Sequence, residues 1–540
     1  SCTTMSDCSM IHDDSLVERD PTPSIVWPDE IPKDDETGLI LGDRRSWFYL
    51  LFVGIFTITL VIGIFIHLKA ILGSHTIFPS KVQGSSTTNT FNSHCSLDEL
   101  WFKCKEDIKG LLPEIPTCVI DTYQEYRTEW IPFVDVDFVQ DDTNICHTAN
   151  KALIMVAYYA QENIASDVQL ENIYALALLY FSLRGENWVD ESWFTSNIHL
   201  RNWMGIHLDS AGHVQEIRLQ QRFLEGTLPS SVFSIFPSLK HIDLSSNLIR
   251  GPLPKRLGKT LESLELDNNF LTGTIPLSWT KSTTIKYIQM DYNQLMGTLP
   301  SELSDMTQLE ILSLASNALE SRIPSDIANC TSLQALDISR NKFDGAIPPQ
   351  LGNLRQLQYL DLSENSFADG TLPLNMLLLT KLSTLILSQC SLTGTISSEM
   401  GKLSKLSYLN LGSNSLRGSI PTEIGKLSTL ESLELEFNGI NGTLPTEFGL
   451  LRQLKLLDLR FNDLTGSLPT EFGRLLQLET FLMASNMLEG EIPKEICNLW
   501  DDGVMTAFGD VFHSAPCDDS SFGGATCPSD ECCQDCSGSS

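Results

Sequence analysis

One segment of about 24 residues recurs twelve times in register along this 540-residue chain, and it constrains the fold more than any other feature. It is exemplified by LKHIDLSSNLIRGPLP at residues 239–254. A fixed period of about 20–50 residues is typical of a solenoid, in which each unit contacts only its neighbours. Length alone would suggest three or four domains. The repeats instead predict one stacked array, with units beginning at Val214, Leu239, Leu261, Ile285, Leu309, Leu333, Leu357, Leu382, Leu406, Leu430, Leu454 and Leu478.

The residues of one unit, 261–276, indicate how it folds. Leu264 and Leu266 are two positions apart, so both point to one face of a short strand. Glu265, between them, must point to the other face. Asn269 follows, with an amide that can both donate and accept hydrogen bonds towards neighbouring turns. No unit can bury its leucines alone, so the stacked units are predicted to share one core and one curved parallel sheet.

The side chains that the strands direct away from the leucine core form what we call the concave face. The position between the two strand leucines is acidic in half of the units, and adjacent positions add aromatic residues. A solvated, charged face is one interpretation. A binding groove is the other, because exposed aromatic residues beside aligned carboxylates contribute little to solubility. The candidate ligand-binding residues are Tyr287, Asp291, Tyr292, Asp337, Asp361, Glu434, Glu436, Phe437, Asp458, Arg460 and Phe461.

After the asparagine, most units continue to a G-x-(I/L)-P element, such as Gly273 to Pro276. This element and the 24-residue length resemble the plant-type leucine-rich repeat family, found in receptor-like proteins and receptor kinase ectodomains. The resemblance covers about residues 203–496. It implies an α/β solenoid, in which the repeats form a right-handed curved stack with a parallel concave sheet.

The sequence departs from the family pattern in a few places. The segment RNWMGIHL resembles the family's amino-terminal cap, in which two cysteines flank Trp-x-Gly-(Val/Ile), but Arg201 and Leu208 stand at the two cysteine positions. The family's usual bridge is therefore absent here. Other departures are expected to bend single turns without breaking the stack: Arg222 and Cys390 for Asn, Ser321 for Gly, Ser397 for Pro, and one extra residue around Asp369.

Charge and motifs exclude several classes of protein. The net charge of −32 argues against binding to nucleic acid or to anionic lipid, since both require a basic surface. The chain also lacks the Gly-rich loop, V-A-I-K, H-R-D and D-F-G motifs of a kinase. None of its ten histidines stands beside a plausible Ser or Cys nucleophile. The sequence therefore predicts no enzyme, no cofactor and no metal site.

Residues 47–68 are 22 residues without a formal charge, and at about 1.5 Å per residue a helix of this length crosses a bilayer core. A retained signal anchor is favoured over a cleaved signal peptide, because the acidic segment 1–46 precedes it. A buried core helix is the third interpretation. We expect 1–46 to be a disordered cytosolic tail and 69–94 to be a Ser/Thr-rich stalk. This layout is similar to single-pass leucine-rich repeat proteins of microalgae.

The cysteines indicate an oxidising compartment, because they cluster at the two ends of the repeats 213–496. We expect a helical cap over 95–212, in which Ser166 and Gln169 fit a capping box that starts a helix, and a Cys-rich cap over 497–540. The acidic loop 135–142 lacks a calcium-ligand pattern. Zinc is the alternative for the last four cysteines. Disulfides are predicted for Cys95, Cys104, Cys118, Cys146, Cys497, Cys517, Cys527, Cys532, Cys533 and Cys536, whereas Cys330 and Cys390 are expected to be buried thiols.

Together these features predict a type II receptor-like glycoprotein in the plasma membrane or a secretory-pathway membrane. Its amino terminus would lie in the cytosol, and its repeats would be extracellular or lumenal, with glycans at Asn329 and Asn441. We expect it to bind a peptide or protein ligand and to signal through a cytosolic or co-receptor partner. The aligned carboxylates Glu434 and Asp458 would repel each other and attract a basic ligand to repeats ten and eleven. A structural or adhesive protein and an inhibitor-like binder of extracellular enzymes are the alternatives.

Overall fold

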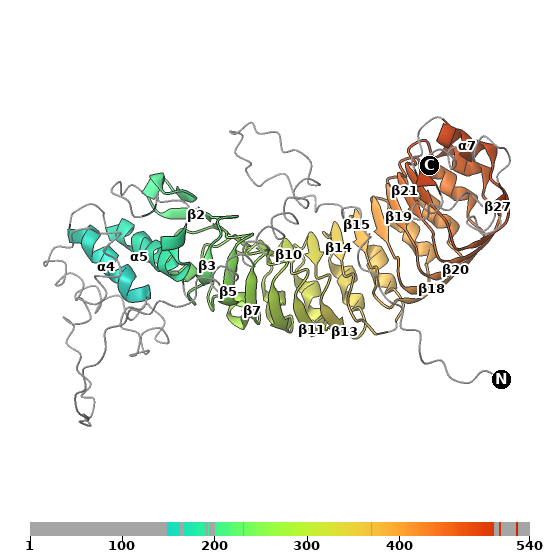
Figure 1. Ribbon diagram of the computed structural model, residues 1–540. Coiled ribbons are helices and arrows are strands. Elements are labelled where there is room, and N and C mark those ends of the chain that lie inside the picture. The colour runs from blue at the N-terminus through green and yellow to red at the C-terminus, as the bar shows by residue number, and fades with distance from the viewer. Residues whose placement is uncertain are drawn as a thin grey trace, which may run out of the picture. The chain divides into compact units, whose positions relative to one another are not determined.

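The computed structural model describes residues 148–161, 167–188, 193, 200–230, 232–368, 370–501, 507–508 and 525–526 (Figure 1). The predicted tail, membrane anchor, stalk, acidic loop and last cysteine cluster fall outside these residues. Among the described helices, none is both long enough and apolar enough to cross a bilayer.

Each repeat contributes one strand to a 14-stranded sheet, which confirms the twelve units and the parallel sheet (Figure 1). Only β1 and β2 pair antiparallel; all other neighbours pair in parallel. In order across the sheet, the strands are β1 (Ile206–Leu208), β2 (Val214–Arg218), β4 (His241–Asp243), β6 (Ser263–Glu265), β8 (Tyr287–Gln289), β10 (Ile311–Ser313), β12 (Ala335–Asp337), β14 (Tyr359–Asp361), β15 (Thr384–Ile386), β17 (Tyr408–Asn410), β19 (Ser432–Glu434), β21 (Leu456–Asp458), β23 (Thr480–Leu482) and β26 (Ala507–Phe508).

The repeat leucines form one core that continues from the N-terminal helices to the last repeat. In the unit at 261–276, Leu261, Leu264 and Leu266 have no exposed surface. Burial of each such side chain contributes roughly 1.5–3 kcal/mol. These leucines therefore share the buried face that the sequence predicts, although in β10, β12, β14 and β15 the positions of the concave face are buried as well.

The repeat asparagines connect each turn to the turn before it. Asn269 Oδ1 accepts a hydrogen bond from Ile249 N at 3.0 Å, and its Nδ2 donates to Leu244 O at 3.0 Å and to Leu266 O at 3.1 Å. Buried backbone groups must find such partners. The predicted double role of the amide is confirmed, and the same pattern recurs at Asn247, Asn293, Asn317, Asn341, Asn365, Asn414, Asn438, Asn462 and Asn486.

A second set of short strands follows the asparagines, and it is divided into two sheets. One sheet contains β13 (Lys342–Asp344), β11 (Ala318–Arg322), β9 (Gln294–Gly297), β7 (Phe270–Gly273), β5 (Leu248–Pro252) and β3 (Glu225–Thr227). The other contains β16 (Thr393–Thr395), β18 (Ser415–Gly418), β20 (Gly439–Gly442), β22 (Asp463–Gly466) and β24 (Met487–Leu488). Repeat seven lies between them and contributes only an isolated bridge from Gly370 to Leu392.

The division coincides with two departures from the repeat pattern. Cys390 stands where an asparagine is expected, and its Sγ donates to Leu362 O at 3.2 Å. In the usual pattern, the asparagine accepts a hydrogen bond from the backbone of the preceding repeat, as Asn341 Oδ1 accepts from Leu319 N. A thiol is a weak acceptor, so Cys390 cannot bind the segment after Asn365 in this way. The extra residue lengthens the same segment. These changes leave the 14-stranded sheet intact, as expected, but they interrupt the second one.

Short 3₁₀ helices follow the second strands and complete most units. They are η5 (Leu277–Lys281), η6 (Ser301–Asp305), η7 (Ser325–Asn329), η8 (Pro349–Asn353), η9 (Leu374–Leu378), η10 (Ser398–Lys402), η11 (Thr422–Lys426), η12 (Thr446–Leu450) and η13 (Thr470–Arg474). Ser397 replaces the usual proline before η10, and its hydroxyl caps the helix by accepting from Glu399 N at 3.2 Å. Ser321 has a φ of 77°, where neighbouring repeats have glycine. Both substitutions are thus accommodated locally.

Helices α4 (Thr148–Gln161) and α5 (Asp167–Ser182) precede the repeats and share their core. Helix α5 begins at Asp167, and Ser166 of the predicted capping box lies outside the described residues. Two 3₁₀ turns follow, η3 (Gly185–Asn187) and η4 (Leu200–Asn202). The remaining elements are α6 (Val232–Ile235), α7 (Lys494–Asp501) and the strand pair β25 (Gly490–Glu491) with β27 (Ala525–Thr526).

Aromatic side chains pack where the family's amino-terminal bridge is missing. Trp203 stacks on Trp193 with ring centroids 5.3 Å apart, and Trp193 meets Trp188 edge-on at 4.9 Å. Tyr180, from α5, contacts Trp188 at 5.2 Å. Such pairs contribute about 0.5–1.5 kcal/mol each beyond the area that they bury. This cluster connects the helices to the first repeat through apolar contacts.

Candidate ligand-binding face

The strand register places the predicted acidic residues beside one another. Asp337 pairs with Asp361 across β12 and β14, and Glu434 pairs with Asp458 across β19 and β21. Neighbouring strands lie about 4.8 Å apart, so each pair occupies one column of the concave face, as the sequence predicts. The structure also shows which of these carboxylates already form hydrogen bonds or ion pairs within the chain.

The carboxylates of Asp337 and Asp361 are bound by their own turns. Asp337 Oδ1 accepts from Ser339 N at 3.0 Å and from Ser339 Oγ at 2.7 Å. Asp361 Oδ1 accepts from Ser363 N at 2.8 Å and from Ser363 Oγ at 2.6 Å. Burial raises the pKa of both carboxyl groups, and Asp337 raises that of Asp361 further. This pair therefore stabilises two turns.

In repeat four, the three candidate residues have different environments. Asp291 accepts hydrogen bonds from Ser313 Oγ at 2.7 Å and from Ala315 N at 2.6 Å, and burial raises its pKa to about 7. Tyr287 is half-buried in β8. Tyr292 is 53% exposed. Of the three, Tyr292 has the side chain most accessible to a ligand.

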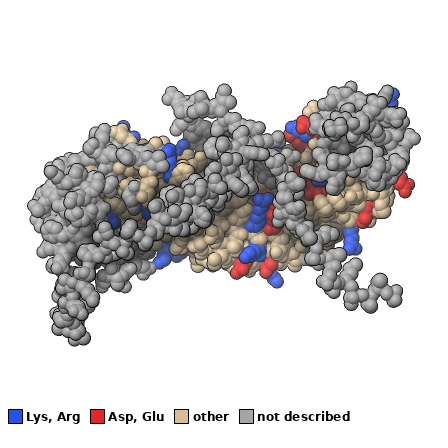
Figure 2. All heavy atoms as spheres, in the orientation of Figure 1, with Lys and Arg blue, Asp and Glu red and all other residues tan. Residues whose placement is uncertain are grey.

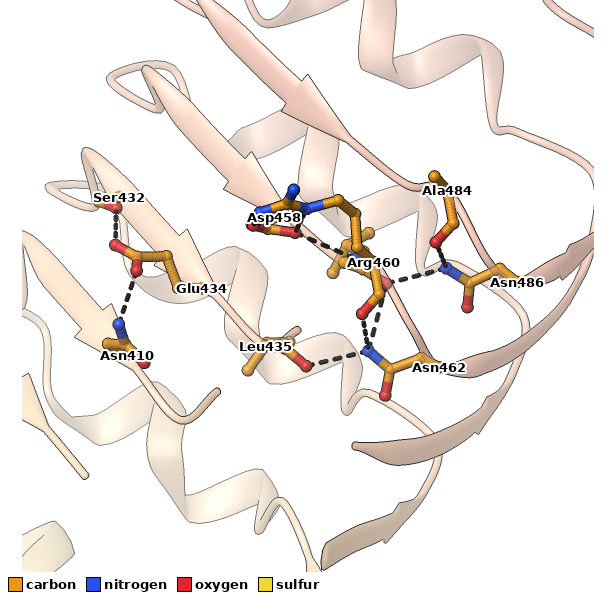
Figure 3. A network of polar contacts seen from close by, with 10 residues as sticks. Asn410, Ser432, Glu434, Leu435, Asp458, Arg460, Asn462, Ala484 and Asn486 are labelled. Carbon is orange, nitrogen blue, oxygen red and sulfur yellow. Dashed lines mark hydrogen bonds and ion pairs between the residues drawn. The ribbon is translucent and has the colours of Figure 1, made fainter. Parts of the chain in front are cut away.

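Polar contacts connect repeats nine to twelve (Figure 3). Glu434 accepts from Asn410 Nδ2 at 2.6 Å and from Ser432 Oγ at 3.0 Å. Arg460 binds Asp458 through two nitrogens, with Nη2 at 2.6 Å from Oδ2 and Nε at 3.0 Å from Oδ1. Bidentate pairs of this kind are strong. Arg460 therefore compensates the charge of Asp458, which reduces the predicted repulsion between Glu434 and Asp458, while binding of a basic ligand by these two residues stays a prediction.

Phe437 and Phe461 form an exposed aromatic stack on the same repeats. Their ring centroids are 4.2 Å apart and the rings are nearly parallel, at 9°. The side chains remain 49% and 41% exposed. Each follows its strand by three residues, at a position where both have a positive φ, 53° and 54°. The equivalent position has a positive φ in the other repeats as well, for example at Tyr292 and Ser413, so the repeat turn sets this conformation and does not require a phenylalanine.

Glu436 lies beside this stack and differs from the other carboxylates. Its Oε2 is buried and has no hydrogen-bond partner among the described residues. Burial raises its pKa to about 7, and the charges of Asp458 and Glu434 contribute to the rise. The sequence identified Glu436 as a candidate, but only the structure separates it from its neighbours.

Sequence reasoning missed two tyrosines on the concave face. Tyr359 and Tyr408 begin β14 and β17, as Tyr287 begins β8. All three tyrosines stand two residues before the column that is acidic in half of the repeats, so reading that position in each repeat of the sequence would have identified them. The face is therefore richer in aromatic side chains than its acidic column suggests.

Charges along the edge of the sheet are paired between repeats. Glu262 binds Lys240 at 3.2 Å and Lys286 at 2.9 Å, and Lys455 binds Glu431 at 2.6 Å. On the described surface visible in Figure 2, acidic and basic side chains are interspersed among uncharged ones. Each exposed pair contributes about 0–1 kcal/mol. These pairs fit a solvated rim around the concave face.

The remaining predicted sites have mixed outcomes. Cys330 and Cys390 are free and buried, which confirms the prediction of two thiols. The ten cysteines expected to form disulfides have no described side chains. Asn329, in η7, and Asn441, in β20, are both exposed. The two glycan acceptors are therefore sterically available.

Fold and concave face together define a plant-type leucine-rich repeat domain. The family described as a leucine-rich repeat region matches residues 382–501, and the family described as Leucine Rich Repeat matches residues 238–259, 260–282, 308–330 and 332–354. The chain is similar to plant leucine-rich repeat receptor-like proteins. Its fold is a scaffold for binding.

Particular relatives come from Arabidopsis thaliana. The leucine-rich repeat receptor-like serine/threonine-protein kinase RGI4 is 38% identical over 88 residues, which cover 16% of this chain and 8% of the relative. Protein STRUBBELIG-RECEPTOR FAMILY 1 is 40% identical over 86 residues, which cover 16% of this chain and 11% of the relative. The chain thus matches only a small part of each curated relative.

Among solved structures, the Arabidopsis receptor kinase HAESA, determined in complex with the peptide hormone IDA and the co-receptor SERK1, has a TM-score of 0.55. It is 30% identical, and the similarity covers 61% of this chain and 60% of that chain. The shared fold is that of a receptor ectodomain.

Proposed function

We propose that this chain is a membrane-anchored, receptor-like recognition protein that binds a peptide or protein ligand on its concave face and signals only through partners. The observation that carries the proposal is the exposed Phe437–Phe461 stack, because two adjacent aromatic rings in solvent are poorly explained by folding alone. The similarity to HAESA, solved with a peptide hormone, supports a peptide ligand.

Capture of ligand by the predicted ectodomain, residues 95–540, tests this function. Tagged protein is incubated with extracellular extract, and bound peptides and proteins are identified by mass spectrometry. Replacing both phenylalanines of the stack by serine is expected to reduce capture at least tenfold, because it removes the apolar anchor. Phe223→Ser is the matched control, since Phe223 is more exposed, at 73%, and also has a positive φ but lies outside the concave face. Equal capture by all three proteins would contradict the proposal.

The proposed topology places residues 1–46 in the cytosol and the repeats outside, with 47–68 as the anchor. Protease added to sealed vesicles is expected to remove only the amino-terminal tail. At least one of Asn329 and Asn441 should carry a glycan that an endoglycosidase removes. The two single Asn→Gln variants identify which acceptor is used. Digestion of the repeats in intact vesicles would show that the orientation is reversed.

A further inference from the structure

The concave face of repeats nine to eleven contains one carboxylate whose surroundings are specialised. A Cβ atom at Gly412 would lie 2.1 Å from Glu436 Oε1. Glycine at 412 therefore leaves the space that the Glu436 carboxylate occupies on the neighbouring repeat. The equivalent position is serine in repeats six, seven and eight, as Ser339, Ser363 and Ser388, which would close this space.

The charges around Glu436 are unbalanced. The charged and titratable groups on the elements packed against it are Tyr408 of β17, Glu434 of β19, and Asp458 and Arg460 on β21 and the turn after it. The guanidinium of Arg460 is bound to Asp458. Three carboxylates thus face one cation, and Glu436 Oε2 has no partner among the described residues.

The aromatic stack begins at the next residue. Phe437 follows Glu436 in sequence, and Phe461 extends the stack onto repeat eleven with its centroid 4.2 Å away. A long aliphatic stem can lie along such rings while its charged head reaches a carboxylate. A guanidinium or ammonium group near a ring face is further stabilised by the ring quadrupole.

We infer that Glu436 and the Phe437–Phe461 stack form a subsite for one lysine or arginine side chain of the ligand, with its stem on the rings and its cationic head paired with the half-buried carboxylate of Glu436. This inference rests on the proposed function, since it specifies the ligand of the same face. It also revises the sequence-based hypothesis, because the carboxylate with an oxygen that no described residue binds is that of Glu436 and not that of Glu434 or Asp458.

The subsite has a pH dependence of defined sign. The pKa of Glu436 is raised to about 7 by burial and by the nearby Asp458 and Glu434. A cationic head binds the ionised carboxylate, so binding releases a proton and affinity should rise between pH 6 and pH 8. The contribution of Glu436 to the stability of the fold changes with pH in the opposite direction. Its protonated form is favoured in the folded chain, so stability falls as pH rises from about 4.5 towards 7.

The test uses the full chain, purified in mild detergent, and a library of random heptapeptides displayed on phage. The wild-type chain at pH 8 is expected to enrich peptides with arginine or lysine next to an apolar residue. Glu436→Gln should weaken binding of the best peptide at least tenfold and remove its pH dependence. Glu447→Gln makes the same change of charge in η12, away from the stack, and should have no effect.

The peptide provides a second arm that does not depend on folding of a variant. Replacing its arginine by citrulline removes the charge, and it should weaken binding to the wild type tenfold but add little in Glu436→Gln. If peptides bind but are not basic, or if the two changes are additive, the subsite is overturned while the proposed function stands. If the wild-type chain enriches no peptide, both are overturned.

Discussion

Replacing Asn341 by leucine is expected to destabilise the middle of the repeat array by about 3 kcal/mol. The Asn341 amide donates to Leu314 O at 2.9 Å, to Ile338 O at 3.2 Å and to Ser339 O at 3.0 Å, and it accepts from Leu319 N at 3.0 Å. Leucine has a similar volume but no polar atom. Each buried backbone group left without a partner costs about 1–3 kcal/mol, partly offset by the added apolar surface.

The loss is measured by urea denaturation, combined with hydrogen exchange to locate it. Because units contact only their neighbours, faster exchange should be concentrated in repeats five and six. Asn353→Leu is the matched control: Asn353 is exposed at the end of η8, so the same substitution should change stability by less than about 0.5 kcal/mol. Equal losses in the two variants would show that the asparagine ladder has no special role.

Phe472→Ala is expected to have the largest effect on the C-terminal repeats, a loss of about 3–5 kcal/mol. Phe472 lies in η13 with no exposed surface, between Phe448 at 5.6 Å and Phe481 at 5.7 Å. These three rings fill the core of repeats ten to twelve. Alanine would leave a cavity that a close-packed interior closes only in part.

Thermal unfolding and hydrogen exchange check this prediction. The control is Phe437→Ala, the same substitution at a ring that is about half exposed, which should cost about 1–2 kcal/mol because less surface and one ring contact are lost there. The two variants also separate stability from binding. Phe437→Ala should weaken ligand capture while the fold remains intact. A larger loss of stability at Phe437 than at Phe472 would contradict the assignment of their roles.

Much of the fold could be predicted because periodicity acts locally and repeats. The spacing of Leu264 and Leu266 predicts a strand face, and Asn269 predicts a connected turn. Both are found in the structure. The division of the second sheet was not predicted. It depends on whether the side chain of Cys390 can accept a hydrogen bond from the preceding turn, and the expected effect of that departure was a bend within one turn.

By itself, the sequence determined which side chains share a column of the concave face, because a 24-residue period places equivalent positions on neighbouring strands. It therefore placed Glu434 beside Asp458, with Glu436 two residues further along the same repeat as Glu434. Only the tertiary structure decided which of them keeps a carboxylate oxygen without a hydrogen-bond partner among the described residues. A hydrogen bond forms or fails over a few tenths of an ångström. Arg460 reaches Asp458, while the absence of a Cβ at Gly412 leaves room for the Glu436 carboxylate, whose Oε2 gains no partner there.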